Sequence, residues 1–144
     1  MKFMSSRNIR RGRFLTTVVA VGFLFVGLSS AAWAWEPKLP NGVRGPSSWY
    51  LNGKDGRYFV PIIQGKLSRP TIGIVKTDSN CRPDDQGLSH CHNQIELLSG
   101  RTITVQNTHK MSKFRCLSPG ERVTVRPDGS SSWAIVQTAP RKPE

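Results

Sequence analysis

The stretch IELLSGRTITV at residues 95–105 decides the fold. Apolar and polar residues alternate on both sides of a central Ser-Gly-Arg, and glycine is the residue that most readily takes the left-handed conformation of a short loop. A three-residue loop opposes Leu97 to Ile103 and Ile95 to Val105, so these four side chains share one face. A two-residue loop would mix apolar and polar residues on each face. The stretch therefore predicts an antiparallel hairpin with one apolar face.

A second hairpin is expected around the turn sequence PDGSS at residues 127–131. A five-residue loop there opposes Val125 to Trp133 and Val123 to Ile135. These pairs give the second hairpin an apolar face that can pack against the first one.

Earlier segments of the chain carry further strand signals. Residues 49–51 and 57–60 flank a loop rich in Asn and Gly, which predicts another hairpin, and residues 71–76 form a strand bounded by turn residues. The alternation in all these segments predicts a small apolar core. Its expected members are Phe59, Ile72, Ile74, Ile95, Leu97, Ile103, Val105, Val123, Val125, Trp133 and Ile135.

Six or seven short strands without helical periodicity predict an all-β domain, either a small antiparallel barrel of the OB-like or SH3-like kind or a compact sandwich. The expected order is a signal helix at residues 1–34, an extended lead-in at 35–48, the β domain at 49–138 and a polar tail at 139–144. The lead-in and the tail are assigned from their Pro, Gly and polar residues and their lack of periodicity.

The first 34 residues have the three parts of a secretory signal peptide. Lys2 and four arginines precede an apolar run at residues 14–28, and Ala32-Trp33-Ala34 has the small-x-small pattern of a cleavage site after Ala34. An uncleaved membrane anchor is the alternative, and it is the only membrane contact that we expect. The sequence predicts export to the periplasm or the exterior of a bacterium.

The mature chain is basic. The full sequence has 21 Lys and Arg against 9 Asp and Glu, and removal of five basic residues with the signal leaves 16 against 9, a net charge of +7. A positive surface attracts polyanions. The leading hypothesis is a non-enzymatic binding or accessory module of the cell envelope, with an anionic polymer or an envelope protein as its partner. Candidate binding residues are Lys54, Arg57, Tyr58, Lys110, Lys113, Arg115, Arg122 and Arg126.

Three cysteines remain in a compartment that oxidises thiols: Cys81, Cys91 and Cys116. An odd number predicts one disulfide and one remaining thiol, or a bond between chains. Three pairings are open, and the sequence does not choose among them. A remote alternative is a thiol enzyme with Cys91 as the nucleophile and His109 as its base.

The histidines suggest a second function. Imidazole is a good ligand for copper and zinc, and His90 and His92 stand two residues apart on one expected strand, so their side chains point to the same face. The register places Cys91 opposite His109 on the core-facing side. The competing hypothesis is therefore a periplasmic copper- or zinc-binding protein that uses His90 and His92, with His109 as a further candidate ligand.

Overall fold

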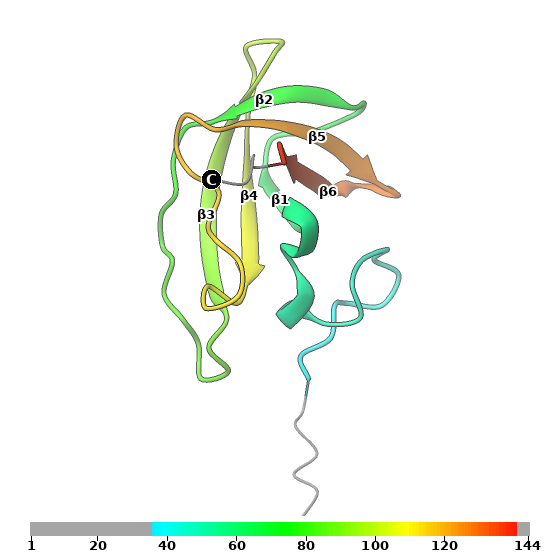
Figure 1. Ribbon diagram of the computed structural model, residues 1–144. Helices are drawn as coiled ribbons and strands as arrows, with labels where there is room; N and C mark the ends of the chain where they lie inside the picture. The colour runs from blue at the N-terminus through cyan, green and yellow to red at the C-terminus, as the bar shows by residue number, and fades with distance from the viewer. Residues whose placement is uncertain (1–35, 141–144) are drawn as a thin grey trace, which may run out of the picture. The chain divides into compact units, whose positions relative to one another are not determined.

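The computed structural model describes residues 36–140 (Figure 1). The expected signal peptide and the last four residues of the expected tail lie outside the described residues. Six strands and two short 3₁₀ turns make up the regular structure. They are η1 (Trp49–Leu51), η2 (Lys54–Gly56), β1 (Arg57–Gln64), β2 (Thr71–Val75), β3 (Ser89–Leu97), β4 (Thr102–His109), β5 (Arg122–Asp128) and β6 (Ser130–Thr138).

The strands form a closed barrel. Each strand pairs antiparallel with two neighbours in the order β1-β4-β3-β2-β5-β6, and β6 pairs again with β1. Closure pairs both edges of the sheet, which an open sheet of this size would leave exposed. The prediction of a small antiparallel all-β barrel is confirmed. Within residues 36–140, no helix is both long enough and apolar enough to cross a membrane.

The hairpin of β3 and β4 has the predicted faces in a different register. Ile95 lies opposite Ile103, where Val105 was expected, and the loop begins one residue earlier, at Leu98. Gly100 has the expected left-handed backbone, with φ 82°. The register differs from the predicted one by two residues, and because side chains alternate with a period of two, the same side chains still face inward. Ile95, Leu97, Ile103 and Val105 are all buried.

In the hairpin of β5 and β6, by contrast, the register error changes which residues of β6 face the core. Its tip pairs Asp128 with Ser130, in the predicted register, but the pairing then shifts by three residues and brings Val125 opposite Val136. An odd shift exchanges the two faces of the strand. The prediction that Trp133 shares the core with Val123 and Val125 is therefore wrong: Trp133 is half-buried, and Ala134 and Val136 are the residues of β6 in the core cluster. Ile135 is buried, as expected, but it lies outside that cluster.

The predicted hairpin at residues 49–60 is also wrong. Trp49–Leu51 and Lys54–Gly56 are 3₁₀ turns, and only the second half of the segment is a strand. Between the two 3₁₀ turns, the side chain of the buried Asn52 forms hydrogen bonds to the backbone that a neighbouring strand would otherwise form. Its Nδ2 donates to the carbonyl oxygens of Phe59 and Thr108 at 3.0 and 2.8 Å, and its Oδ1 accepts from the Phe59 N–H at 2.7 Å.

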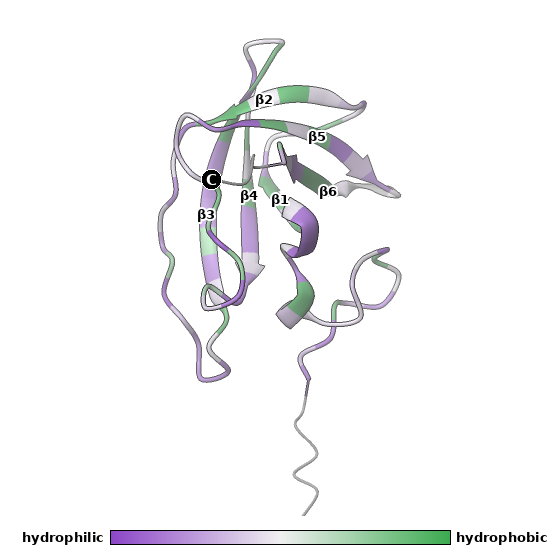
Figure 2. Ribbon diagram, viewed as in Figure 1, coloured by the Kyte–Doolittle hydropathy of each residue, from purple (hydrophilic) through white to green (hydrophobic). Residues whose placement is uncertain are grey.

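Three other predicted core residues lie outside the core. In β1, Tyr58 and Val60 face the interior, and Phe59 is half-buried on the outer side. In β2, Val75 is buried, while Ile72 is half-buried and Ile74 is exposed. Each of these strands has apolar residues on both faces, so alternation alone did not identify the inner one. Figure 2 shows apolar and polar segments following each other along the strands.

The lead-in packs beside the start of the barrel. The Trp49 N–H donates to the Pro37 carbonyl oxygen at 2.8 Å, and the Trp49 ring stacks on Trp133 with 6.2 Å between centroids. A Cβ atom on Gly45 would come within 2.5 Å of Leu39 and 3.2 Å of Phe59. This close packing explains why Phe59 and Trp133 are half-buried although they lie outside the core.

Candidate functional site

The three cysteines converge on one end of the barrel from three segments. Cys81 lies in the connection between β2 and β3, Cys91 lies on β3, and Cys116 lies in the connection between β4 and β5. Cys81 and Cys91 form a disulfide, which selects one of the three open pairings. Cys116 is the free cysteine, and its Sγ lies 3.9 Å from the Sγ of Cys91.

A carboxylate completes this group. Asp78 Oδ1 lies 3.2 Å from the Sγ of Cys81, and the ligand atoms of Asp78 and the three cysteines all lie within 4.8 Å of one another. The Nδ2 group of Asn93 orients the carboxylate by donating to Asp78 Oδ1 at 2.9 Å. We call Asp78, Cys81, Cys91 and Cys116 the sulfur cluster.

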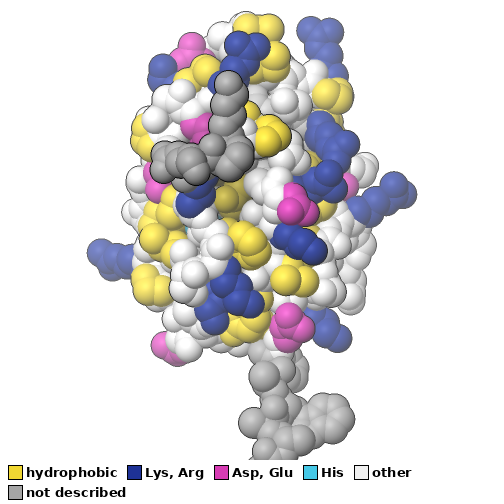
Figure 3. Space-filling model, in the orientation of Figure 1, with side chains coloured by type: hydrophobic (Ala, Val, Ile, Leu, Met, Phe, Trp, Pro, Cys, Tyr) yellow, Lys and Arg dark blue, Asp and Glu magenta, His cyan; other side chains and the backbone are white. Residues whose placement is uncertain are grey.

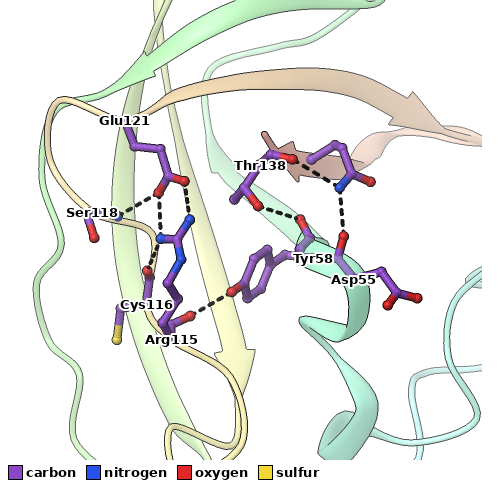
Figure 4. A network of polar contacts seen from close by, with 9 residues as sticks. Asp55, Tyr58, Arg115, Cys116, Ser118, Glu121 and Thr138 are labelled. Carbon is purple, nitrogen blue, oxygen red and sulfur yellow. Dashed lines mark hydrogen bonds and ion pairs between the residues drawn. The ribbon is translucent and has the colours of Figure 1, made fainter. Parts of the chain in front are cut away.

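The loop that carries Cys116 is held by side chains on both sides (Figure 4). Arg115 forms a two-pronged ion pair with Glu121, in which Nη1 and Oε2 are 2.8 Å apart, and Nη1 also donates to the Cys116 carbonyl oxygen at 2.9 Å. The Tyr58 hydroxyl donates to the Arg115 carbonyl oxygen at 2.6 Å. A bidentate Arg–carboxylate pair fixes geometry well, so these contacts hold the backbone at Arg115 and Cys116 in place.

The surroundings of Cys116 oppose ionisation of its thiol. Burial raises the pKa of Cys116 to about 11, and the neighbouring Asp78 carboxylate adds to the rise, while the Arg115 guanidinium opposes it. Since the thiolate is the nucleophilic form of cysteine, the thiol is a weak nucleophile at neutral pH.

Buried polar atoms without partners lie beside the cluster. Asn107 is directly opposite Cys91 across the β3–β4 pair, and within residues 36–140 neither its Nδ2 nor its Oδ1 has a hydrogen-bond partner. The same holds for Asn93 Oδ1 and His109 Nε2. Leaving a buried polar group unsatisfied costs about 1–3 kcal/mol, so a concentration of them needs a functional explanation.

The expected histidine site is divided between the two faces of the sheet. His90 contacts Thr108 Oγ1 through Nδ1 and Asp84 Oδ2 through Nε2, both at 2.9 Å, and His92 Nδ1 lies 3.3 Å from Asn80 Nδ2. His109 is fully buried, where its ring packs edge-on against Tyr58 and burial lowers its pKa. It is therefore not brought together with the two outward histidines. The expected pairing of Cys91 with His109 is wrong, because Ser89 stands opposite His109.

Most of the candidate binding residues are dispersed. Tyr58 is buried, so its ring does not reach the surface, and Arg115 is engaged by Glu121. Lys54 and Arg57 lie in and next to η2, and Arg122 and Arg126 are exposed on β5. On the face of the molecule drawn in Figure 3, basic side chains are spread out and interspersed with acidic ones.

One basic surface gathers two of the predicted lysines. Lys110 Nζ lies 4.6 Å and Lys113 Nζ 6.0 Å from the centroid of the Tyr50 ring. A turn brings the two lysines together, because the N–H groups of Lys113 and Phe114 both donate to the Lys110 carbonyl oxygen at 2.9 Å. Among the described residues, neither lysine forms an ion pair with a carboxylate. We call Tyr50, Lys110 and Lys113 the Tyr50 patch.

Sequence reasoning missed the acidic and amide members of the site. Asp78 belongs to a polar run, DSN at residues 78–80, which follows the expected strand at 71–76 and is typical of a turn. Its position three residues before Cys81 was the available signal. Asn93 and Asn107 have polar side chains on otherwise inward-facing positions of β3 and β4, a feature that appears only once the strand faces are known.

Comparison with known proteins gave no match, either to a family model or among curated proteins and solved structures.

Proposed function

We propose that the protein is a non-enzymatic binding module of the bacterial cell envelope, and that it binds an anionic polymer at the Tyr50 patch. The signal-peptide pattern of residues 1–34 and the charge of +7 in the remaining chain support the location and the sign of the ligand charge. The observation that carries the proposal is the approach of two ammonium groups to one tyrosine ring, at 4.6 and 6.0 Å.

The physical reason is charge balance. A tyrosine ring attracts a cation over its face, but the interaction at an exposed site is worth only about 0.5–1 kcal/mol. Two ammonium groups that share one ring also repel each other. A phosphate or carboxylate group between Lys110 and Lys113 removes this repulsion and forms charge-assisted hydrogen bonds, which are about twice as strong as neutral ones.

The test separates a local site from general charge. The mature chain is loaded on immobilised heparin, used as a model polyanion, and eluted with increasing NaCl. The double variant K110Q/K113Q is compared with K38Q/K66Q, which removes the same charge from two exposed lysines outside the Tyr50 patch. We expect K110Q/K113Q to elute at clearly lower salt than the control. Equal elution of the two variants would contradict the Tyr50 patch, and retention of the unaltered chain that does not change with salt would contradict the anionic ligand.

A further inference from the structure

We propose that the sulfur cluster is a redox-controlled zinc site, in which Asp78, Cys81, Cys91 and Cys116 together bind one Zn²⁺ ion after the Cys81–Cys91 disulfide has been reduced. This inference does not depend on the proposed binding of a polyanion, because the residues involved are different.

The spacing of the donor atoms fits a tetrahedral ion. With Zn–S bonds of about 2.3 Å, two sulfurs of a tetrahedral site lie about 3.8 Å apart, and a sulfur and a carboxylate oxygen about 3.6 Å apart. The Sγ atoms of Cys91 and Cys116 are 3.9 Å apart, and Asp78 Oδ1 is 3.2 Å from the Sγ of Cys81. The remaining donor atoms lie within 4.8 Å of one another. Cys81 and Cys91 must separate, which cleavage of their bond permits.

The donor set favours zinc among the common metal ions. Three thiolates and one carboxylate supply four ligands, the number that structural zinc sites use. Copper(I) prefers sulfur alone, whereas magnesium and calcium prefer oxygen alone.

The neighbouring amides are suited to a second shell around the ion. Protein groups that hydrogen-bond to metal ligands orient them and strengthen binding. Asn93 already donates to Asp78, and Asn107 stands opposite Cys91 with a buried Nδ2 group that has no partner among the described residues. A thiolate at Cys91 would give that N–H group an acceptor. The proposed site would thus offer a partner to a buried amide that has none among the described residues.

The frame around the cluster is already in place. Cys91 belongs to β3, the Cys116 loop is anchored by the Arg115–Glu121 ion pair, and Asp78 is held by Asn93. Three separate segments thus present their ligands without rearrangement of the barrel, which lowers the entropy cost of binding.

The chemistry requires a reductant, which we take to be a protein dithiol of the thioredoxin class. The dithiol transfers two electrons and two protons to the Cys81–Cys91 bond, which breaks to give two thiols, and the dithiol itself becomes a disulfide. Binding of Zn²⁺ then releases one proton from each of the three thiols to solvent, while Asp78 binds as a carboxylate. In the reverse direction, a protein disulfide accepts two electrons from the Cys81 and Cys91 thiolates and, with two protons from solvent, becomes a dithiol, while the Cys81–Cys91 bond forms again. The ion then leaves to solvent, and the Cys116 thiolate takes up one proton.

The test uses the mature chain in two states. One sample is kept oxidised, and the other is treated with a phosphine reductant that is then removed without air. Zn²⁺ is titrated into each in competition with a chromophoric chelator. We expect the reduced chain to bind one ion and the oxidised chain to bind none with comparable affinity. Equal binding by both states would overturn the proposal.

Matched variants locate the site. C116S and D78N should weaken zinc binding by at least about tenfold, while D85N, which alters an exposed carboxylate nearby in the chain, should bind as the unaltered chain does. The double variant H90A/H92A should also bind zinc as the unaltered chain does. Loss of zinc binding in this variant would overturn the proposal in favour of the histidines. K110Q/K113Q should bind zinc normally, so failure of one proposal leaves the other testable.

A spectroscopic measurement covers the case in which C116S or D78N fails to fold. Co²⁺ replaces Zn²⁺ in the reduced, unaltered chain, where tetrahedral thiolate ligation gives intense visible bands and a thiolate-to-cobalt charge-transfer band. Absence of these bands would overturn the proposal without recourse to any variant.

Discussion

The Sγ atom of Cys116 lies 3.9 Å from the Sγ atom of Cys91, although 25 residues separate the two cysteines in the chain. Cys91 is bonded to Cys81, so the third sulfur approaches a disulfide that is already complete. The free thiol is also next to the Asp78 carboxylate, which opposes its ionisation. The oxidised protein therefore keeps an inert thiol within reach of two other sulfurs.

The first prediction concerns the reactivity of Cys116. A pKa of about 11 leaves roughly one thiol in a thousand ionised at pH 8, against about a quarter for an unperturbed cysteine. We expect iodoacetamide to alkylate Cys116 in the folded, oxidised chain on the order of a hundredfold more slowly than in the chain unfolded with urea. Mass spectrometry of timed samples measures both rates. Equally fast labelling in the two states would show that the thiol is not suppressed.

The second prediction concerns stability below neutral pH. Burial lowers the pKa of His109 in the folded chain, so between that value and about 6.5 the unfolded chain binds more protons. The free energy of unfolding should level off well above pH 6.5 and fall as the pH decreases through and below it, by up to about 1.4 kcal/mol per pH unit. Urea unfolding at several pH values between 5 and 7.5 measures this slope.

The control for this prediction is a pair of substitutions. H109Q should flatten the dependence on pH, because the titrating group is gone, whereas H92Q on the outer face should keep it. A slope that persists in H109Q would assign the effect to other groups. The pKa of Asp84 is also lowered, but this carboxylate changes the free energy of unfolding only near and below its ordinary pKa of 3.8, which lies outside the measured range.

The third prediction concerns Asn52, whose side chain makes three hydrogen bonds to the backbone beside β1 and β4. N52A leaves one N–H and two carbonyl groups without these bonds, and we expect a loss of about 2–4 kcal/mol in the free energy of unfolding. The exposed Asn41 provides the control, since N41A should change stability by less than about 0.5 kcal/mol. Similar urea midpoints for the two variants would contradict the role of Asn52.

The fourth prediction compares two glycines with positive φ. Gly53 has φ 109°, and a Cβ atom there would come within 2.7 Å of Phe114 and 2.8 Å of Tyr58, whereas Gly87 has φ 73° and open space around it. G87A should cost about 1–2 kcal/mol from backbone strain alone. G53A should cost about 1–3 kcal/mol more, because it also overpacks the interior. Thermal unfolding of both variants measures the difference, and equal losses would exclude the packing contribution.

The sequence predicted most reliably what depends on alternation within one hairpin. At residues 95–105, the alternating apolar residues lie on one face only, so the inner face could be predicted. The register error of two residues did not change which side chains face inward. The same reasoning failed for β1 and β2, because both strands have apolar residues on both faces. The prediction placed Phe59 of β1, and Ile72 and Ile74 of β2, on the inner face, where their apolar neighbours lie instead. The third error came from the shift of three residues in the pairing of β5 with β6 near Asp128. Nothing in the local sequence pattern predicts this shift, which exchanges the inner and outer faces of β6.

By itself, the sequence determined that the chain is an all-β domain with a small apolar core, because these properties follow from local periodicity. The count of three cysteines predicted either one disulfide with a remaining thiol or a bond between chains. Only the tertiary structure decided which faces of β1, β2 and β6 are buried, which cysteines are bonded, and that Asp78 and Cys116 meet beside that bond. The physical reason is that closing the barrel fixes all six strand registers together. The contacts of any one side chain are then set by strands distant in the chain, which no local pattern records.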